Sequence, residues 1–155
     1  MTAREAVEAV TRGVLRAFPS PSSSNSDPGH SGGVIICALR SYSREHSLEM
    51  AELACELFQE SKGVICGFDL AGDEGTYPLS LHKEAILYCK ARSLPVTVHA
   101  GEWPDTTANL QLALQLGVDR IGHGAQSLIT RITLDSPHVI FTHMITLITL
   151  ITCVN

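Results

Sequence analysis

The sequence predicts an α/β fold of parallel strands that alternate with helices, and it favours part of a TIM-type (β/α) barrel over an open doubly wound sheet. Continuous apolar runs of strand length recur along the chain, as is typical of parallel strands covered on both faces. Their ends, at Leu39, Leu70, His99 and His123, are spaced near the ~30 residues of one βα unit. Each helix leads directly into the next strand, without the long connection that would mark a reversal of strand order, and this favours the barrel.

The first part of the chain contains a helix, a polar loop and a strand. Thr2–Phe18 has the apolar spacing of an amphipathic helix, with Thr2 as N-cap and Glu5 completing a capping box. Residues 18–33 are rich in Pro, Ser and Gly, so we expect a mobile loop there. Val34–Leu39 is the first apolar strand.

Three further units repeat the pattern of helix followed by strand. The predicted helices are Ser47–Glu60, Ser80–Arg92 and Thr106–Leu116. The predicted strands are Val64–Leu70, Val96–His99 and Arg120–Gly122. Residues 1–128 therefore form one partial barrel.

Residues 129–155 differ in character from the rest of the chain. The dipeptide Ile-Thr recurs there, and the terminal sequence ITLITLITCVN has a three-residue period that suits neither a strand nor a helix. We expect a divergent Ile/Thr-rich tail that is appended to the fold, and we hypothesise that it arises from a truncated or alternatively spliced transcript or from an error in the gene model. Transcript and genomic sequences that share an intact junction would contradict the hypothesis.

Composition and charge exclude several classes of function. The net charge is −5 and the 11 Lys and Arg residues are scattered, so a nucleic-acid duplex is not an expected partner. The N-terminus lacks the apolar region of a secretory signal, and no apolar run approaches the ~18 residues of a membrane span. We expect a soluble, cytoplasmic protein without membrane contact.

Polar residues follow the ends of the predicted strands, where catalytic groups of parallel barrels lie. The motifs are Asp69-Leu70-Ala71-Gly72-Asp73-Glu74, His99-Ala100-Gly101-Glu102 and Gly122-His123-Gly124. Taken singly, each has a structural explanation, as does Arg40 after the first strand, which we interpret as a solvated loop charge. Ala100-Gly101 allows the backbone to curl, so His99 and Glu102 can converge on one pocket. Three consecutive units with a carboxylate or imidazole beside glycine indicate a site.

In this order and spacing, the three motifs resemble the central part of the adenosine deaminase family of zinc hydrolases, over roughly residues 2–128. The resemblance implies a (β/α)8 barrel with one catalytic zinc and hydrolytic removal of ammonia from C6 of adenosine or a related purine. It further implies that His99 is a zinc ligand, that Glu102 protonates the purine ring and that His123 orients the zinc-bound hydroxide. Gly72 corresponds to a backbone contact with the base, and Asp73 lies in the same loop.

The chain departs from the family's pattern in its metal ligands. No His-x-His occurs anywhere, and no Asp-Asp pair is present, which leaves His99 as one of four expected ligands. The first and last βα units are also missing, and a barrel needs ~200 residues or more. We therefore expect this polypeptide alone to bind zinc poorly and not to turn over adenosine.

Two alternatives remain open. The substrate could be a methylated AMP or adenine, because the residues that would hold ribose or phosphate are not expected in this segment. The chain could instead be a non-catalytic binding or interaction module that self-associates through strand edges left unpaired by the missing units.

Overall fold

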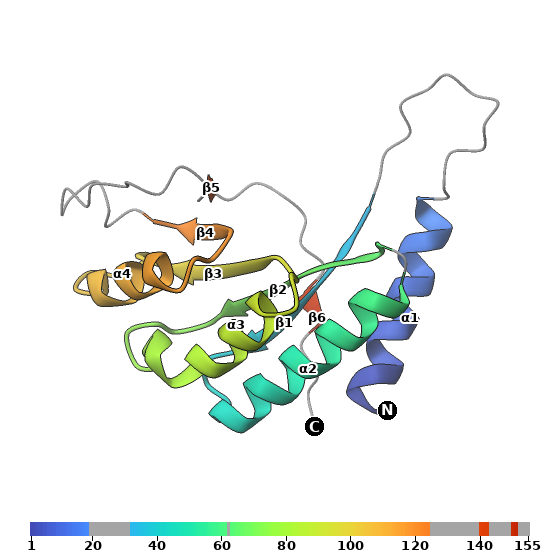
Figure 1. Ribbon diagram of the computed structural model, residues 1–155, viewed down its shortest axis with the longest axis horizontal. Helices are drawn as coiled ribbons and strands as arrows, with labels where there is room; N and C mark the ends of the chain where they lie inside the picture. The colour runs from blue at the N-terminus through green and yellow to red at the C-terminus, as the bar shows by residue number, and fades with distance from the viewer. Residues whose placement is uncertain (19–31, 62, 125–139, 143–149, 152–155) are drawn as a thin grey trace, which may run out of the picture.

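Figure 1 shows a computed structural model that describes residues 1–18, 32–61, 63–124, 140–142 and 150–151. The strands are β1 (Val34–Leu39), β2 (Ile65–Ala71), β3 (Val96–Ala100), β4 (Arg120–His123), β5 (Ile140–Thr142) and β6 (Leu150–Ile151). The helices are α1 (Ala3–Ala17), α2 (Arg44–Glu60), the 3-10 turn η1 (Leu79–His82), α3 (Lys83–Lys90) and α4 (Thr107–Gln115). The predicted alternation of strands and helices is confirmed.

The strands form one parallel sheet in the order β5-β4-β3-β2-β1-β6. From β1 to β5, neighbours in the sheet are also neighbours in the sequence, so these five strands show no reversal of order. Strand β6 is the exception, because it pairs with β1 at the other side of the sheet. Helices α2, α3 and α4 lie on the same face of the sheet (Figure 1). A doubly wound sheet would carry helices on both faces, whereas an arc of a barrel carries them on its outer face only.

The main core lies between the sheet and these helices. Phe68, Leu70 and Val98 are fully buried on the sheet side, and Ala51 and Ala54 are fully buried on α2. The small alanines allow α2 to approach the strands closely. Because alternate strand residues point to opposite faces, the residues between these core positions face the inner side of the arc.

Local capping decides where the helices begin. The predicted capping box of α1 is present, because the Glu5 amide donates to the Thr2 hydroxyl and the Thr2 amide donates to the Glu5 carboxylate. Helix α2 begins at Arg44, ahead of the predicted Ser47, since the Ser43 hydroxyl accepts a hydrogen bond from the His46 amide at 3.1 Å.

The third predicted helix is interrupted near its start. Leu79–His82 forms a 3-10 turn, and the α-helix itself begins only at Lys83. The Leu79 amide donates to the Asn109 side chain rather than to a helical carbonyl, which ties the turn to α4. A contact 30 positions away along the chain cannot be seen in a local sequence pattern.

Two short strands of the predicted Ile/Thr-rich tail pair with the sheet. Strand β5 pairs parallel with β4, and β6 pairs parallel with β1 (Figure 1). Strands of two or three residues suffice for pairing because the β-branched residues of this segment suit extended backbone. Most of the expected mobile loop (residues 18–33) and the rest of the tail lie outside the described residues.

Within the described chain, no helix combines the length and apolar character needed to cross a bilayer.

Truncation of the core phenylalanine should destabilise the sheet. Phe68 is 0% exposed, so Phe68→Ala should lower the free energy of unfolding by about 3–5 kcal/mol through lost burial and a cavity. Phe18→Ala is the matched control, because Phe18 is 39% exposed at the end of α1 and its loss should cost much less. Urea denaturation of both variants measures the difference, and equal losses would contradict the assignment of the core.

Candidate functional site

The parallel register brings three of the predicted motifs to one edge of the sheet. Leu70 of β2 pairs with Val98 of β3, and Ala100 of β3 pairs with His123 of β4. The carboxyl ends of β2, β3 and β4 therefore lie side by side, and the loops that follow them start from the same edge.

His123 contacts both His99 and Glu102 at this edge. The Nδ1 atom of His99 lies 3.1 Å from Nε2 of His123, and the two ring centroids are 5.2 Å apart. The same Nε2 atom lies 3.5 Å from a carboxylate oxygen of Glu102. His99 and Glu102 thus lie on either side of the His123 imidazole.

The backbone around these side chains requires unusual conformations. His123 has φ of +73°, a left-handed conformation that is uncommon for a residue with a side chain and that recurs at functional sites. Its neighbour Gly122 lies against the ring of His99, and a Cβ there would approach His99 Nδ1 to 3.2 Å. Glycine at 122 therefore gives the His99 imidazole its space.

A buried aspartate lies behind His99 on the inner face of the sheet. Asp69 is 0% exposed, and its Oδ2 atom is 3.2 Å from His99 Nε2, although neither Asp69 oxygen has a partner with hydrogen-bond geometry. The close Asp69 carboxylate raises the pKa of His99 against the lowering effect of burial. Burial, assisted by the same carboxylate, raises the pKa of the Cys37 thiol. Asp69 therefore favours the protonated form of both neighbours.

Gly72 and Asp73 shape the loop after β2. Gly72 has φ of +106°, a conformation that side chains rarely adopt, and this allows β2 to turn sharply at the edge. The Asp73 carboxylate accepts hydrogen bonds from the amides of Gly75 and Thr76 at 2.9 and 3.1 Å, and the bonds with Thr76 hold its pKa below the usual value. The structure directs Asp73 into its own loop and not toward the two histidines.

Arg40 is a buried residue of the site, and the interpretation of a solvated loop charge was wrong. Its side chain is 0% exposed, and its guanidinium donates to the carbonyl of His99 at 2.7 Å and to the carbonyl of Tyr77 at 3.0 Å. These bonds link the end of β1 to the end of β3 and to the loop after β2. The position of Arg40 at the end of a strand is visible in the sequence and could have indicated a site residue. Its hydrogen-bond partners could not be predicted, because they are distant in sequence.

Glu74 is a second residue to which the sequence assigned no role. It is 3% exposed, and its carboxylate accepts hydrogen bonds from the segment that follows β3. The local sequence shows only an acidic pair, Asp73-Glu74. It does not indicate that the Asp73 carboxylate binds amides of its own loop whereas the Glu74 carboxylate binds the segment after the next strand.

The described residues do not fit a catalytic zinc on their own. Such a site has about three protein ligands and a water. No group of three His, Cys, Asp or Glu side chains in the described part of the chain is placed to hold a metal ion. His99 also directs its two ring nitrogens at Asp69 and His123. We therefore derive no chemical step through a metal from this chain.

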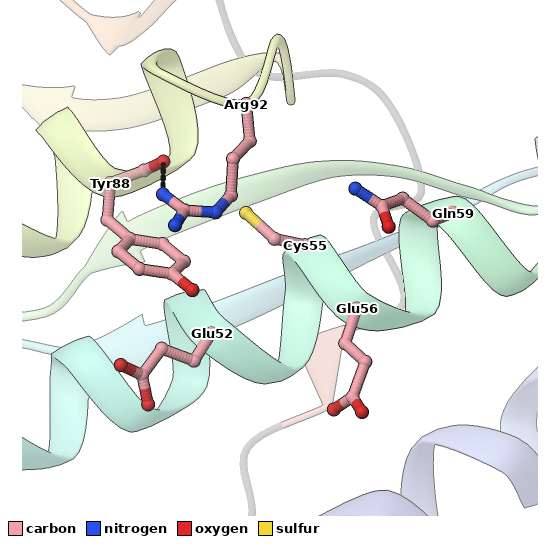
Figure 2. A pocket seen from close by; sticks show the side chains of 6 residues that line it. All are labelled: Glu52, Cys55, Glu56, Gln59, Tyr88 and Arg92. Carbon is pink, nitrogen blue, oxygen red and sulfur yellow. Dashed lines mark hydrogen bonds between the residues drawn. The ribbon is translucent and has the colours of Figure 1, made fainter.

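The pocket in Figure 2 lies elsewhere, between α2 and α3 on the helix side of the sheet. It has a volume of about 330 Å3 and is lined by Glu52, Cys55, Glu56, Gln59, Tyr88 and Arg92. The Arg92 guanidinium lies 3.4 Å from the centre of the Tyr88 ring and donates to the Tyr88 carbonyl at 3.2 Å (Figure 2). This pocket is not part of the strand-end edge, where the candidate site lies.

Sequence comparison identifies the family. Residues 2–135 match the family described as adenosine deaminase. "Adenosine deaminase 1" of Streptomyces coelicolor is 38% identical over 128 residues, which cover 81% of this chain and 30% of the relative. The chain thus spans about a third of the length of the curated relatives that it matches.

Solved structures show the same fold. The apo N6-methyl-AMP deaminase of Arabidopsis thaliana superposes with a TM-score of 0.64 at 29% identity, over 80% of this chain and 36% of that one. An amidohydrolase from Burkholderia ambifaria, solved with bound Zn, superposes with a TM-score of 0.69 over 84% of this chain and 33% of that one. At 20% identity, this second likeness shows the fold alone. The three strand-end motifs, the parallel sheet and the sequence match together show that this chain belongs to the adenosine deaminase family.

Proposed function

We propose that this chain forms the central part of an aminohydrolase site that converts adenosine or a related aminopurine, with water, into the hydroxyl or oxo purine and ammonia. The observation that carries the proposal is the contact between His99, His123 and Glu102 at the carboxyl edge of adjacent strands. Two imidazoles and a carboxylate provide the groups that hold a water and deliver a proton.

Glu102 is suited to be the general acid of this reaction. Its carboxylate side chain is 49% exposed, so a substrate at the edge can reach it, and it lies beside His123. In its protonated form it gives a proton to the ring nitrogen next to C6 as water attacks, which lowers the barrier to addition. His123 orients that water. Of the two protons that the water loses, one departs with the ammonia and the other returns to Glu102, which restores the acid.

Among the described residues, His99 is the one that would contribute to a metal. Zinc, when bound, would supply a hydroxide at neutral pH. His99 provides one of the ligands that such an ion needs, and the others are not among the described residues.

The class of substrate is open within the aminopurines. The Arabidopsis neighbour is named for N6-methyl-AMP and the Streptomyces relative for adenosine. Methylated AMP and adenine therefore stand as alternatives to adenosine.

A second candidate function is purine binding without turnover. The incomplete set of metal donors favours it, because an ammonia-releasing site in this family needs more ligands than His99. The two candidates differ in whether the segment supports turnover once the missing ligands are supplied.

A chimera tests the first candidate. The matching segment of the Streptomyces relative is replaced by residues 2–135 of this chain, so that the rest of the barrel comes from the relative. We expect ammonia release from adenosine, and Glu102→Gln should lower kcat by about 10²–10⁴-fold because the general acid is lost. Glu84→Gln on α3, an exposed residue, is the matched control and should leave the rate unchanged. A folded, zinc-loaded chimera without turnover would favour the binding module instead.

The isolated chain should behave differently. With His99 as the one expected ligand, the purified polypeptide should contain far less than one zinc per chain and should release no ammonia from adenosine. Metal analysis and an ammonia assay measure both quantities. One zinc per chain together with turnover would show that the chain holds a complete site.

A further inference from the structure

One buried carboxylate binds the backbone that carries Glu102. Glu74 lies in the loop after β2, and its side chain reaches across to the segment between β3 and α4. Its two oxygens accept hydrogen bonds from five donors: Gly101 N at 3.1 Å, Glu102 N at 2.6 Å, Trp103 N at 3.2 Å, Thr106 Oγ1 at 2.9 Å and Asn109 Nδ2 at 3.2 Å. The Thr106 hydroxyl shares its single proton between Glu74 and the Trp103 carbonyl, which lies at 2.7 Å.

The chemistry of these contacts suits a fixed anchor. An ionised carboxylate accepts hydrogen bonds only, and hydrogen bonds to a charged acceptor are about twice as strong as neutral ones. Three consecutive amides that converge on one anion fix the orientation of the peptide planes between them. Because a buried charge is costly without such partners, the segment and Glu74 hold each other in place.

The same contacts exclude Glu74 from the reaction itself. It is 3% exposed, and both oxygens are occupied by donors from the protein. A substrate could reach it only if the segment moved away. Glu102, whose amide makes the shortest of the five bonds, carries its own side chain toward His123.

We propose that Glu74 is a positioning residue, which sets the place of the Glu102 carboxylate at the edge of the sheet by binding the amides of Gly101, Glu102 and Trp103. The proposal rests on the proposed function in that Glu102 is taken as the proton donor. The contact between Glu74 and the segment can nevertheless be measured without any turnover.

The isosteric variant Glu74→Gln tests the proposal in the full chain. The glutamine side chain has one accepting oxygen, and its NH2 group can only donate. That NH2 group would face two or three N–H or O–H donors whose hydrogen bonds the carboxylate accepts in the unmodified protein. Amide hydrogen exchange at positions 101–103 should become about tenfold faster or more, because these N–H groups lose their acceptor. Far-UV circular dichroism should stay that of the unmodified chain.

Trp103 provides a second, local measurement, because it is the single tryptophan of the sequence and its side chain is 49% exposed. Its fluorescence emission should shift in Glu74→Gln and stay unchanged in the control Glu84→Gln, which makes the same replacement at an exposed site on α3. Residues of α2 form no hydrogen bond with the Glu74 carboxylate, so they should keep their exchange protection.

Three outcomes would overturn the proposal. These are unchanged protection at 101–103 in a folded Glu74→Gln chain, an equal loss of protection over the whole chain, and fast exchange of the Glu102 amide in the unmodified protein. The last needs no variant, so it applies even if Glu74→Gln fails to fold. An inactive chimera with intact Glu74 contacts would instead count against the proposed function alone.

Discussion

The parallel register of β2, β3 and β4 is the constraint on which the site depends. Because Ala100 pairs with His123 and Leu70 pairs with Val98, the three strands end together, and their following residues emerge at one edge. A shift of one residue in any strand would send its side chains to the opposite face. The buried core on the helix side, around Phe68 and Val98, stabilises this register. The geometry of the site therefore depends on the packing of the core.

Buried charge ties the loops of this edge together. The Arg40 guanidinium donates a hydrogen bond to the carbonyl of His99. The Glu74 carboxylate accepts one from the amide of Glu102, and the Asp69 carboxylate lies beside the His99 ring. Burial of the Arg40 guanidinium lowers its pKa, while the nearby carboxylates of Glu74, Asp69 and Asp73 act in the opposite direction. Such groups are stable inside a protein only when their partners are in place, so the loops form as a set.

The sequence predicts the parts of this structure that depend on local pattern. Apolar runs locate β1 to β4, and Thr2 with Glu5 locates the start of α1. What it does not reveal depends on contacts between distant residues. Glu74 and Arg40 acquire their roles only when neighbouring strands are paired, and the 3-10 turn before α3 follows from the bond between Leu79 and Asn109. The pairing of β5 and β6 likewise depends on the edges that the sheet offers them.

The central claim is that Glu102 and His123 act as one unit, and a double-mutant cycle in the chimera tests it most directly. The variants are Glu102→Gln and His123→Asn, since asparagine tolerates the positive φ at position 123. Residues that work together are strongly non-additive, so the double variant should lose about as much activity as the more damaging single variant. Losses that multiply independently would show that the two side chains, although 3.5 Å apart, do not share a catalytic role.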